Sequence, residues 1–337
     1  MKAYQLQARN DLAALQCVEL PEPTIGPGEV LVRMRAHSMN YRELLILRGG
    51  YVLNQKLPVI PTSDGAGDVV AVGDGVTEFQ VGSRVVSTFF RDWVSGPPTT
   101  ANMATALGGA IDGTLAEYVA FPERGLVKAP DHLSYAEAAT LTCAGLTAWN
   151  SLTTGGLLPG RTILTLGTGG VSVFALQLAK LAGARVIVTS SSDEKLEKAR
   201  ALGADVTINY RTQPDWHLDV LELTDGVGVD QVVELGGAGT LANSIAATRL
   251  GGYVGIIGVL TGVGAGGFTP ALVFFNHLRC QGIYVGSRHM YTQMNAAVAL
   301  HQMRPVIDTV VPFSSAPEAY NLLESARHFG KIVISHD

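Results

Sequence analysis

The amino-acid sequence predicts an α/β protein that joins a β-rich region to a doubly wound parallel sheet. From Glu29 to about Tyr118, short apolar runs separated by Gly, Pro and Asp predict antiparallel strands, with a turn at Asp74-Gly75 and the shape of a small barrel. After about Leu133, strand-like and helix-like patterns alternate, which is typical of parallel strands joined by helices. At roughly 100 to 200 residues per domain, the chain is long enough for two domains.

The alternation in the second region gives its elements in order. A β-like run at 162–166 leads into apolar residues at helical spacing from Val171 to Ala182. Further strands are predicted at 185–189, 206–210, 230–235, 253–260 and 280–286. Helices are predicted at 193–202 and 240–250.

Two segments do not follow either pattern. Residues 91–111 crowd Gly, Pro and Thr without a sustained period, which predicts a long loop. The last fifty residues predict a helix at 292–303 and a strand at 331–335, and we expect them to return to the first domain. The predicted organisation is a first domain at 1–128, a second domain at 129–284 and a return segment at 285–337.

Composition narrows the classes of function. The net charge of −5 and the lack of a basic stripe argue against a nucleic-acid partner. The N-terminus has no signal-peptide pattern, and glycines interrupt the longest apolar run, so no membrane partner is expected. Three widely spaced cysteines without a C-x-x-C pair favour the reducing cytoplasm.

A glycine-rich turn after the strand at 162–166 predicts a dinucleotide site. Its residues are Gly167, Thr168, Gly169, Gly170 and Val171. Such a turn lets the backbone approach a pyrophosphate, which the N-terminus of the next helix then binds. Ser172 stands where the fingerprint has its third glycine, and a purely structural turn is the alternative.

The end of the next strand bears on the choice of nicotinamide cofactor. An Asp or Glu there would hold a ribose 2′-hydroxyl, but the sequence has Thr189, Ser190, Ser191 and Ser192, followed by Lys195. Hydroxyls and a cation favour a 2′-phosphate, so we expect NADP(H) rather than NAD(H). In the alternative interpretation Ser191 and Glu194 form a capping box and Lys195 is solvated.

Several motifs in one order resemble the medium-chain dehydrogenase/reductase superfamily, in its zinc-independent branch around quinone oxidoreductase. They cover nearly the whole chain and include AHSMNYRELLILRGGY, LPVIPTSDGAGDVVAVGDGV, DGTLAEYV, EAATLTCAGLTAW, LTLGTGGVSVFALQLAKLAGARVIV, KLEKARALGAD and GKIVIS. The resemblance implies a GroES-like catalytic domain built from both chain ends, a Rossmann cofactor domain between them and a substrate cleft where they meet. It also implies a homodimer paired through the sheet edge near Tyr253–Gly258 and Gln281–Gly286.

The resemblance places the catalytic zinc ligands of its metal-dependent members at Asn40, at Ser63 beside Asp64, and at Cys143. An amide and a hydroxyl do not replace thiolate and imidazole as zinc ligands at neutral pH. The stretch 88–112, which corresponds to the structural zinc lobe, contains no cysteine. We therefore expect no zinc in either role, and we expect Cys143 to pack as a small apolar residue.

Without a metal, hydrogen-bond donors must stabilise the charge that develops on a reduced carbonyl. The resemblance implies Asn40, Tyr41 and Tyr51 for this role, since an amide or a phenol can donate to the oxygen. The structural alternatives are that Asn40 fixes a turn and that the tyrosines close the edge of a core.

Further cofactor contacts are implied by position in the family pattern alone. Each can equally be a surface or core residue. They are Thr147, Tyr210, Gly236, Val259 and Leu260, with Arg288 and Lys331 as candidates for contacts to phosphates.

Three functions remain open at this point. The first is hydride transfer from NADPH to a quinone or an α,β-unsaturated carbonyl, whose conjugation spreads the developing charge. The second is a zinc-free alcohol dehydrogenase or aldehyde reductase, which must stabilise a localised alkoxide. The third is a protein that binds NADPH without turnover.

Overall fold

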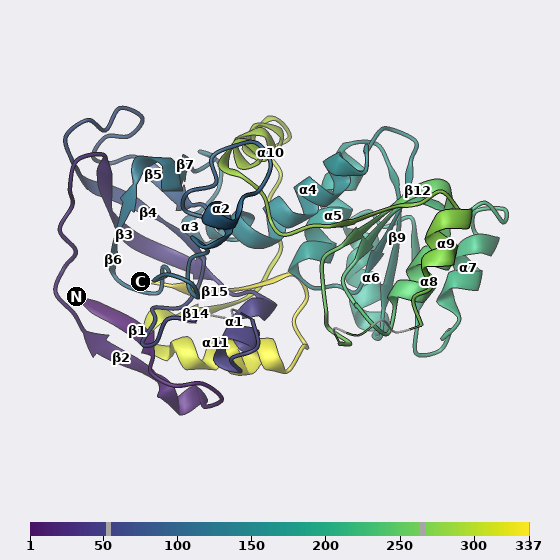
Figure 1. The fold of residues 1–337 in the computed structure, drawn as a ribbon, viewed down its shortest axis with the longest axis horizontal. Coiled ribbons are helices and arrows are strands. Elements are labelled where there is room, and N and C mark those ends of the chain that lie inside the picture. The colour runs from purple at the N-terminus through teal and green to yellow at the C-terminus, as the bar shows by residue number, and fades with distance from the viewer. Residues whose placement is uncertain (52–54, 263, 265–266, 337) are drawn as a thin grey trace. The chain divides into compact units, whose positions relative to one another are not determined.

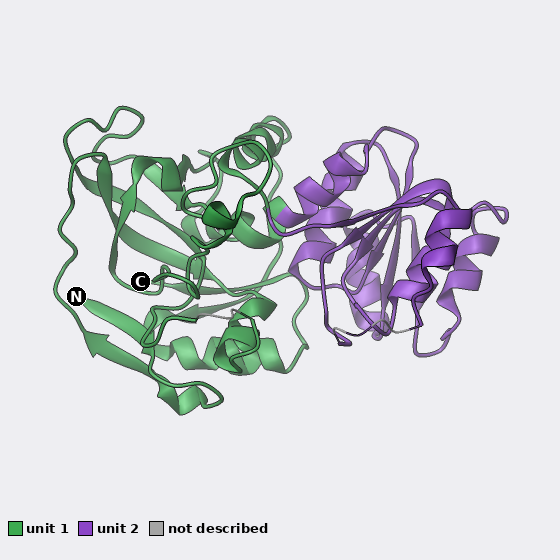
Figure 2. Ribbon diagram, viewed as in Figure 1, with its two compact units in different colours: residues 1–146, 286–337 green, residues 147–285 purple. Residues whose placement is uncertain are grey.

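Residues from both ends of the chain build one structural unit, and the residues between them build another (Figure 2). The computed structural model describes residues 1–51, 55–262, 264 and 267–336. Unit 1 comprises residues 1–146 and 286–337, and unit 2 comprises residues 147–285. The first boundary lies after Leu146 rather than after residue 128, so the helical turns at 135–146 belong with the β-rich unit.

The strand β3 (Glu29–Ser38) is the centre of unit 1, because β4, β6 and β15 all pair with it in antiparallel register (Figure 1). Val333 of β15 lies opposite Ser38, so the C-terminal segment completes the sheet. The sheet runs in the order β14 (Ile307–Pro312), β15 (Lys331–Ser335), β3, β4 (Asp64–Val72), β5 (Arg84–Ser87) and β7 (Leu126–Lys128). Strand β6 (Tyr118–Pro122) also pairs with β3. A separate two-stranded sheet consists of β1 (Lys2–Leu6) and β2 (Leu15–Glu19).

Side-chain caps explain where the helices of unit 1 depart from the predicted bounds. Thr99 and Asn102 form a capping box, which starts a short helix inside the predicted loop 91–111. Ser287 caps α10 by accepting a hydrogen bond from Met290 N, so this helix begins before residue 292. The helices are α1 (Tyr41–Leu47), α2 (Thr100–Met103), α3 (Tyr135–Ala139), a π-helical turn (Leu141–Gly145), α4 (Leu146–Thr154), which runs into unit 2, α10 (Arg288–Leu300) and α11 (Ala316–Glu324).

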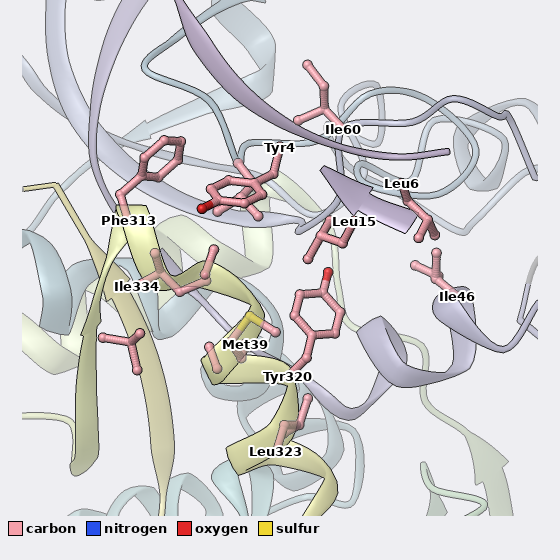
Figure 3. Packing of buried hydrophobic residues seen from close by; sticks show 14 of the residues in the cluster. Tyr4, Leu6, Leu15, Met39, Ile46, Ile60, Phe313, Tyr320, Leu323 and Ile334 are labelled. Carbon is pink, nitrogen blue, oxygen red and sulfur yellow. The ribbon is translucent and has the colours of Figure 1, made fainter. Parts of the chain in front are cut away.

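The two chain ends share a hydrophobic core (Figure 3). The ring of Tyr4 packs edge-on against Phe313 at a centroid distance of 5.2 Å, and its hydroxyl donates to Ser314 O at 2.9 Å. Leu6 and Tyr320 belong to the same cluster. Contacts between residues about 310 positions apart therefore hold the return segment in place.

The predicted strands of the second region form one parallel sheet in the order β10-β9-β8-β11-β12-β13. Every pairing in it is parallel, so the carboxyl ends of the strands share one edge. The strands are β8 (Thr162–Leu166), β9 (Arg185–Ser190), β10 (Val206–Asn209), β11 (Val229–Glu234), β12 (Thr248–Ile256) and β13 (Arg279–Gly282), and the helices are α5 (Gly170–Leu181), α6 (Asp193–Ala201), α7 (Trp216–Glu222), α8 (Leu241–Ala246) and α9 (Pro270–Phe275).

Two predictions for this sheet need correction. The helix expected at 240–250 ends at Ala246, because Thr248 already pairs with Val229 of β11. The segment Tyr253–Gly258, expected at the sheet edge, begins within β12, which lies between β11 and β13. The segment that begins at Gln281 starts within the outer strand, which is Arg279–Gly282. Among the described residues, no helix is both long and apolar enough to cross a membrane.

Helix α1 carries two buried charged side chains. Arg42 is 5% exposed and Glu43 is 1% exposed, and Arg42 Nη1 lies 3.4 Å from Glu43 Oε1. The guanidinium of Arg42 also lies over the rings of Phe89 and Tyr51, at 4.7 and 5.2 Å from their centroids. Burial raises the pKa of Glu43 to about 7, although the charge of Arg42 opposes the shift.

The raised pKa of Glu43 predicts a pH dependence of stability. The folded protein binds this proton more tightly than the unfolded chain, so stability is greatest below pH 4.5 and falls as the pH rises toward about 7. We expect the variant Glu43→Gln to gain stability relative to the parent protein over this window, by up to about 1.4 kcal/mol per pH unit. Urea unfolding of both proteins at pH 5 and pH 8 measures the difference.

The matched control is Glu324→Gln, which removes a carboxylate that is 61% exposed and paired with Arg48 on the surface. This control should follow the parent protein at both pH values. A stability difference between Glu43→Gln and the parent protein that is the same at pH 5 and pH 8 would contradict the shift.

Candidate functional site

The carboxyl edge of the parallel sheet in unit 2 brings together most of the predicted cofactor residues. The chain runs from β8 to β9 and β10 on one side, and then returns to β11 on the other side of β8. The loops after β8 and β11 therefore leave the sheet in opposite directions. In open parallel sheets this switch point is where ligands bind.

The turn after β8 has the geometry of a phosphate cradle. Gly167 adopts a φ of +77°, which favours glycine, and its N–H donates to Thr189 O at 2.8 Å. Gly169 is the N-cap of α5 and has no side chain to cap it, and a Cβ there would meet no heavy atom within 4 Å. The space in front of the N-terminus of this 12-residue helix is thus open to an anion.

Ser172 shows how the imperfect third position of the fingerprint is accommodated. Its Oγ donates to Leu166 O at 2.7 Å, so the hydroxyl bonds to the strand that precedes the turn. The side chain is 3% exposed. The predicted residues 167–171 lie together at this turn, with Thr168 buried and Val171 half-buried.

The end of β9 carries hydroxyls and approaches the end of β10. Ser190 is 3% exposed, and Tyr210 N donates to Ser190 O at 3.0 Å, which places Tyr210 beside this strand end. Asp193, the next carboxylate along the chain, accepts from Asn209 Nδ2 at 2.7 Å. The predicted residues Ser190, Ser191 and Tyr210 are therefore neighbours, and Ser191 is half-buried.

The predicted capping box at Ser191 and Glu194 does not form. Ser192 is the N-cap of α6, and its Oγ accepts from Lys195 N at 3.4 Å. The helix therefore begins one residue later than the box requires. Lys195 lies in the first turn of α6, half-buried, directly after the hydroxyl-rich strand end.

The loops after β11 and β12 meet at the same edge. Thr261 N donates to Gly236 O at 2.7 Å, so Gly236 lies against the loop that carries Val259 and Leu260. Val259 is 38% exposed and Leu260 is 54% exposed. Thr147, by contrast, lies in the first turn of α4 and is 3% exposed.

In unit 1, the residues at the zinc positions come together around a buried lysine. Asn40 precedes α1, Asp64 begins β4, and Cys143 lies in the π-helical turn. Lys331 begins β15, and its Nζ donates to Asn40 Oδ1 at 2.5 Å and to Met39 O. Lys331 is 3% exposed and Asp64 is 0% exposed.

Hydrogen bonds already occupy both oxygens of Asp64. Ser63 Oγ donates to Asp64 Oδ1 at 2.6 Å, and Cys143 N donates to Asp64 Oδ2 at 3.3 Å. Burial raises the pKa of Asp64, which the ammonium of Lys331 and the hydrogen bond from Asn40 oppose. Burial lowers the pKa of Lys331, which the charge of Asp64 opposes.

These contacts do not fit a zinc ion. Burial and the nearby charge of Asp64 raise the pKa of the Cys143 thiol, whereas a zinc ligand must be a thiolate. The ammonium of Lys331 takes the amide oxygen of Asn40 and would repel a divalent cation. Among the described residues, no group of three His, Cys, Asp or Glu side chains is placed to hold a metal ion.

Two predicted cofactor residues lie elsewhere than the sequence pattern suggested. Lys331 has its ammonium buried against Asn40, and Arg288 Nε donates to Leu126 O at 2.7 Å while its Nη2 pairs with Glu78. Both side chains are therefore engaged within unit 1, and this placement does not support phosphate contacts. Position in the family pattern carried the two predictions, and it does not reveal the partners that bind these charges, which are distant in sequence.

The predicted catalytic residues lie around α1. Asn40 is 9% exposed, with its Oδ1 turned to Lys331 and its Nδ2 3.5 Å from Ser38 O. Tyr41 and Tyr51 are half-buried and pack against the core shared by the two chain ends. Asn40 occupies the N-cap position of α1 but makes no side-chain capping bond, so the structural role of fixing this turn is not seen.

The comparisons with known proteins agree with this architecture. Residues 26–131 match the alcohol dehydrogenase GroES-like domain, and residues 170–300 match the zinc-binding dehydrogenase domain. A zinc-type alcohol dehydrogenase-like protein, C1773.06c of Schizosaccharomyces pombe, is 45% identical over 95% of this chain and 94% of its own.

Two solved structures show the same fold along their whole lengths. The crystal structure of an NAD-dependent alcohol dehydrogenase has a TM-score of 0.91 and 37% identity, and covers 100% of both chains. A quinone oxidoreductase from Pseudomonas syringae pv. tomato DC3000 has a TM-score of 0.84 and 29% identity, and covers 99% of both chains. The chain therefore belongs to the medium-chain dehydrogenase/reductase superfamily, with a GroES-like domain and a Rossmann-like sheet, and it is an oxidoreductase.

Proposed function

We propose that this protein transfers hydride from NADPH to a quinone or an α,β-unsaturated carbonyl, without zinc. The observation that carries the proposal is the buried lysine at the zinc position: Lys331 donates to Asn40 Oδ1 where metal-dependent relatives need an open ligand sphere. A reductase that lacks a Lewis acid favours substrates whose conjugation spreads the developing charge.

The contacts of Asn40 define what it can do for a substrate. An ammonium group only donates hydrogen bonds, so Lys331 fixes Oδ1 toward itself and turns Nδ2 to the other side. In the free protein Nδ2 lies against Ser38 O and the Asp64 carboxylate, and we assign to it the hydrogen bond that a substrate oxygen receives as negative charge builds there. Tyr41 or Tyr51 can supply the proton that completes the reduction, because a phenol is a competent general acid.

The glycine turn and the end of β9 support the choice of cofactor. A bound nicotinamide dinucleotide supplies the hydride. The open N-terminus of α5 suits its pyrophosphate, and Ser190, Ser191 and Lys195 suit a 2′-phosphate on its adenosine ribose.

A second candidate is an NAD(H)-dependent alcohol dehydrogenase or aldehyde reductase. Similar proteins support this candidate, because one of them is an NAD-dependent alcohol dehydrogenase that is 37% identical to this chain. That reaction leaves a localised alkoxide, which would depend more strongly on Tyr41 or Tyr51. The three free cysteines suit the cytoplasm in either case.

Subunit pairing is a further part of the proposal. Among the described residues, the outer strand β13 pairs with β12 alone. Helix α9, which precedes β13 in the sequence, has Phe274 and Phe275 exposed to 73% and 72%. An open strand edge and exposed aromatic rings are typical of an interface. We propose that two copies pair through α9 and β13 to form a homodimer.

A substrate panel after metal removal tests the activity. We expect NADPH oxidation with quinones or enones to continue unchanged after dialysis against a chelator, with less than one zinc ion per ten chains in the purified protein. The variants to compare are Asn40→Ala, Tyr41→Phe and Tyr51→Phe. Each variant that removes a group donating to the substrate oxygen should lower kcat about a hundredfold. The proposal would be overturned by one zinc ion per chain, with activity that is lost on chelation and restored by zinc. Faster turnover of aldehydes or alcohols than of quinones and enones would favour the second candidate.

The cofactor preference is tested by Lys195→Ala. Loss of a cation from a 2′-phosphate should lower the ratio of kcat/KM for NADPH to that for NADH about tenfold, which is about 1.4 kcal/mol. The control is Lys198→Ala, since Lys198 lies on the same helix and pairs with Glu194 at 2.8 Å. Equal ratios in the parent protein and both variants would exclude the contact.

The dimer is tested by light scattering after size-exclusion chromatography. The parent protein should elute at twice the mass of one chain, and Phe274→Asp should shift it toward a single chain because a carboxylate is costly to bury. Leu300→Asp, which changes a leucine 79% exposed in unit 1, is the control and should stay dimeric. A parent protein that elutes with the mass of one chain would refute the pairing.

A further inference from the structure

A buried carboxylate at the end of β11 organises the loop that follows it. Glu234 is 0% exposed. Its Oε1 accepts from Gly236 N at 2.8 Å, from Gly237 N at 2.9 Å and from Thr240 Oγ1 at 2.6 Å, and its Oε2 accepts from Ser244 Oγ. Within the described part of the chain, the ion pairs do not include Glu234.

The carboxylate holds the loop by hydrogen bonds rather than by opposite charge. A buried carboxylate is strongly destabilising unless donors surround it, and four donors fill most of its acceptor positions. All four come from residues 236–244, so the charge and the loop conformation stabilise each other. The packing is close, because a Cβ at Gly236 would lie 2.1 Å from Thr240 Oγ1.

A second loop closes over the first. Thr261 Oγ1 donates to Gly236 O at 2.7 Å and accepts from Gly239 N at 2.7 Å, and Thr261 N also donates to Gly236 O. Ala238 N donates to Gly262 O at 3.2 Å. The loops after β11 and β12 therefore form one hydrogen-bonded unit, which we call the edge loop pair (residues 235–240 and 257–262).

The edge loop pair lies at the carboxyl edge of the sheet, on the strand next to β8. The register of β11 with β8 puts Val233 opposite Thr165, so Glu234 ends its strand beside the start of the glycine turn. Val259 and Leu260 of the edge loop pair are exposed there. This is the side of the switch point opposite the hydroxyl-rich end of β9.

We infer that Glu234 is a positioning residue for the dinucleotide, which it does not itself contact: with Thr261 it holds the edge loop pair in the conformation that receives the cofactor. The inference rests on the proposed function, in which this edge binds a nicotinamide dinucleotide. Three glycines in residues 236–239 are otherwise free to sample many conformations. Ordering them in advance removes an entropic cost from cofactor binding.

The variant Glu234→Gln tests this role, because glutamine keeps the shape but removes the charge and one acceptor oxygen. We expect the Kd for NADPH, measured by cofactor fluorescence, to rise roughly tenfold, while kcat at saturating NADPH changes less than twofold. A purely structural role would lower stability without this split between binding and turnover.

Asp230→Asn is the matched control at the opposite end of the same strand. Asp230 accepts from Arg161 Nη1 at 2.5 Å, Arg249 Nε at 2.7 Å and Thr162 N at 2.8 Å, and it lies at the amino edge of the sheet. Its loss should lower the unfolding midpoint as the loss of Glu234 does, but should leave the Kd for NADPH unchanged. Equal weakening of NADPH binding in both variants would overturn the inference.

A second pair of variants covers the case in which Glu234→Gln does not fold. Thr261→Val removes the hydroxyl that bridges Gly236 and Gly239, whereas Thr261→Ser keeps it. We expect weaker NADPH binding in the valine variant and parent-like binding in the serine variant. Parent-like affinity in both overturns the inference, and a parent protein that binds neither NADPH nor NADH overturns the proposed function first.

Discussion

Parallel pairing of β8 with β9 on one side and with β11 on the other is the constraint on which the candidate cofactor edge depends. Because parallel strands end at the same edge, this pairing brings together the glycine turn, the hydroxyl-rich end of β9 and the loop after Glu234. None of these segments is close to the others along the chain. Their chemistry is shared only because the sheet aligns them.

A different constraint governs unit 1, where charged groups are buried in the protein. A lone buried ammonium is strongly unfavourable, so Lys331 requires Asn40, Met39 O and the nearby carboxylate of Asp64. The same contacts fix the orientation of the Asn40 amide. A buried ammonium thus fixes which end of the neighbouring amide faces it.

The sequence predicts local features well and long-range partners poorly. The turn at Gly167 and the parallel strands follow from short patterns, because backbone geometry there is set by neighbouring residues. Ser191 and Ser192 are adjacent and chemically identical, so the sequence does not show that Ser192 is the residue that caps α6. The predicted end of the helix at 240–250 was wrong, because Thr248 pairs with a strand that sequence periodicity does not reveal.

The site residues divide in the same way. Ser190, Ser191 and Gly236 lie at the predicted strand ends, since strand ends can be located from pattern. Lys331 was expected at a phosphate but is bound to Asn40, 291 residues away. The sequence analysis did not single out Glu234, although a lone Glu two residues before a run of glycines at a strand end was a visible signal.

The interleaved order of the two units has a consequence for biosynthesis. Unit 2 is one continuous stretch, so it can fold as soon as residue 285 has left the ribosome. Unit 1 must wait, because β15 and the core around Phe313 arrive last and its central strand β3 lacks one neighbour until then. During that interval the uncovered flank of β3 is open to pairing with the wrong strand.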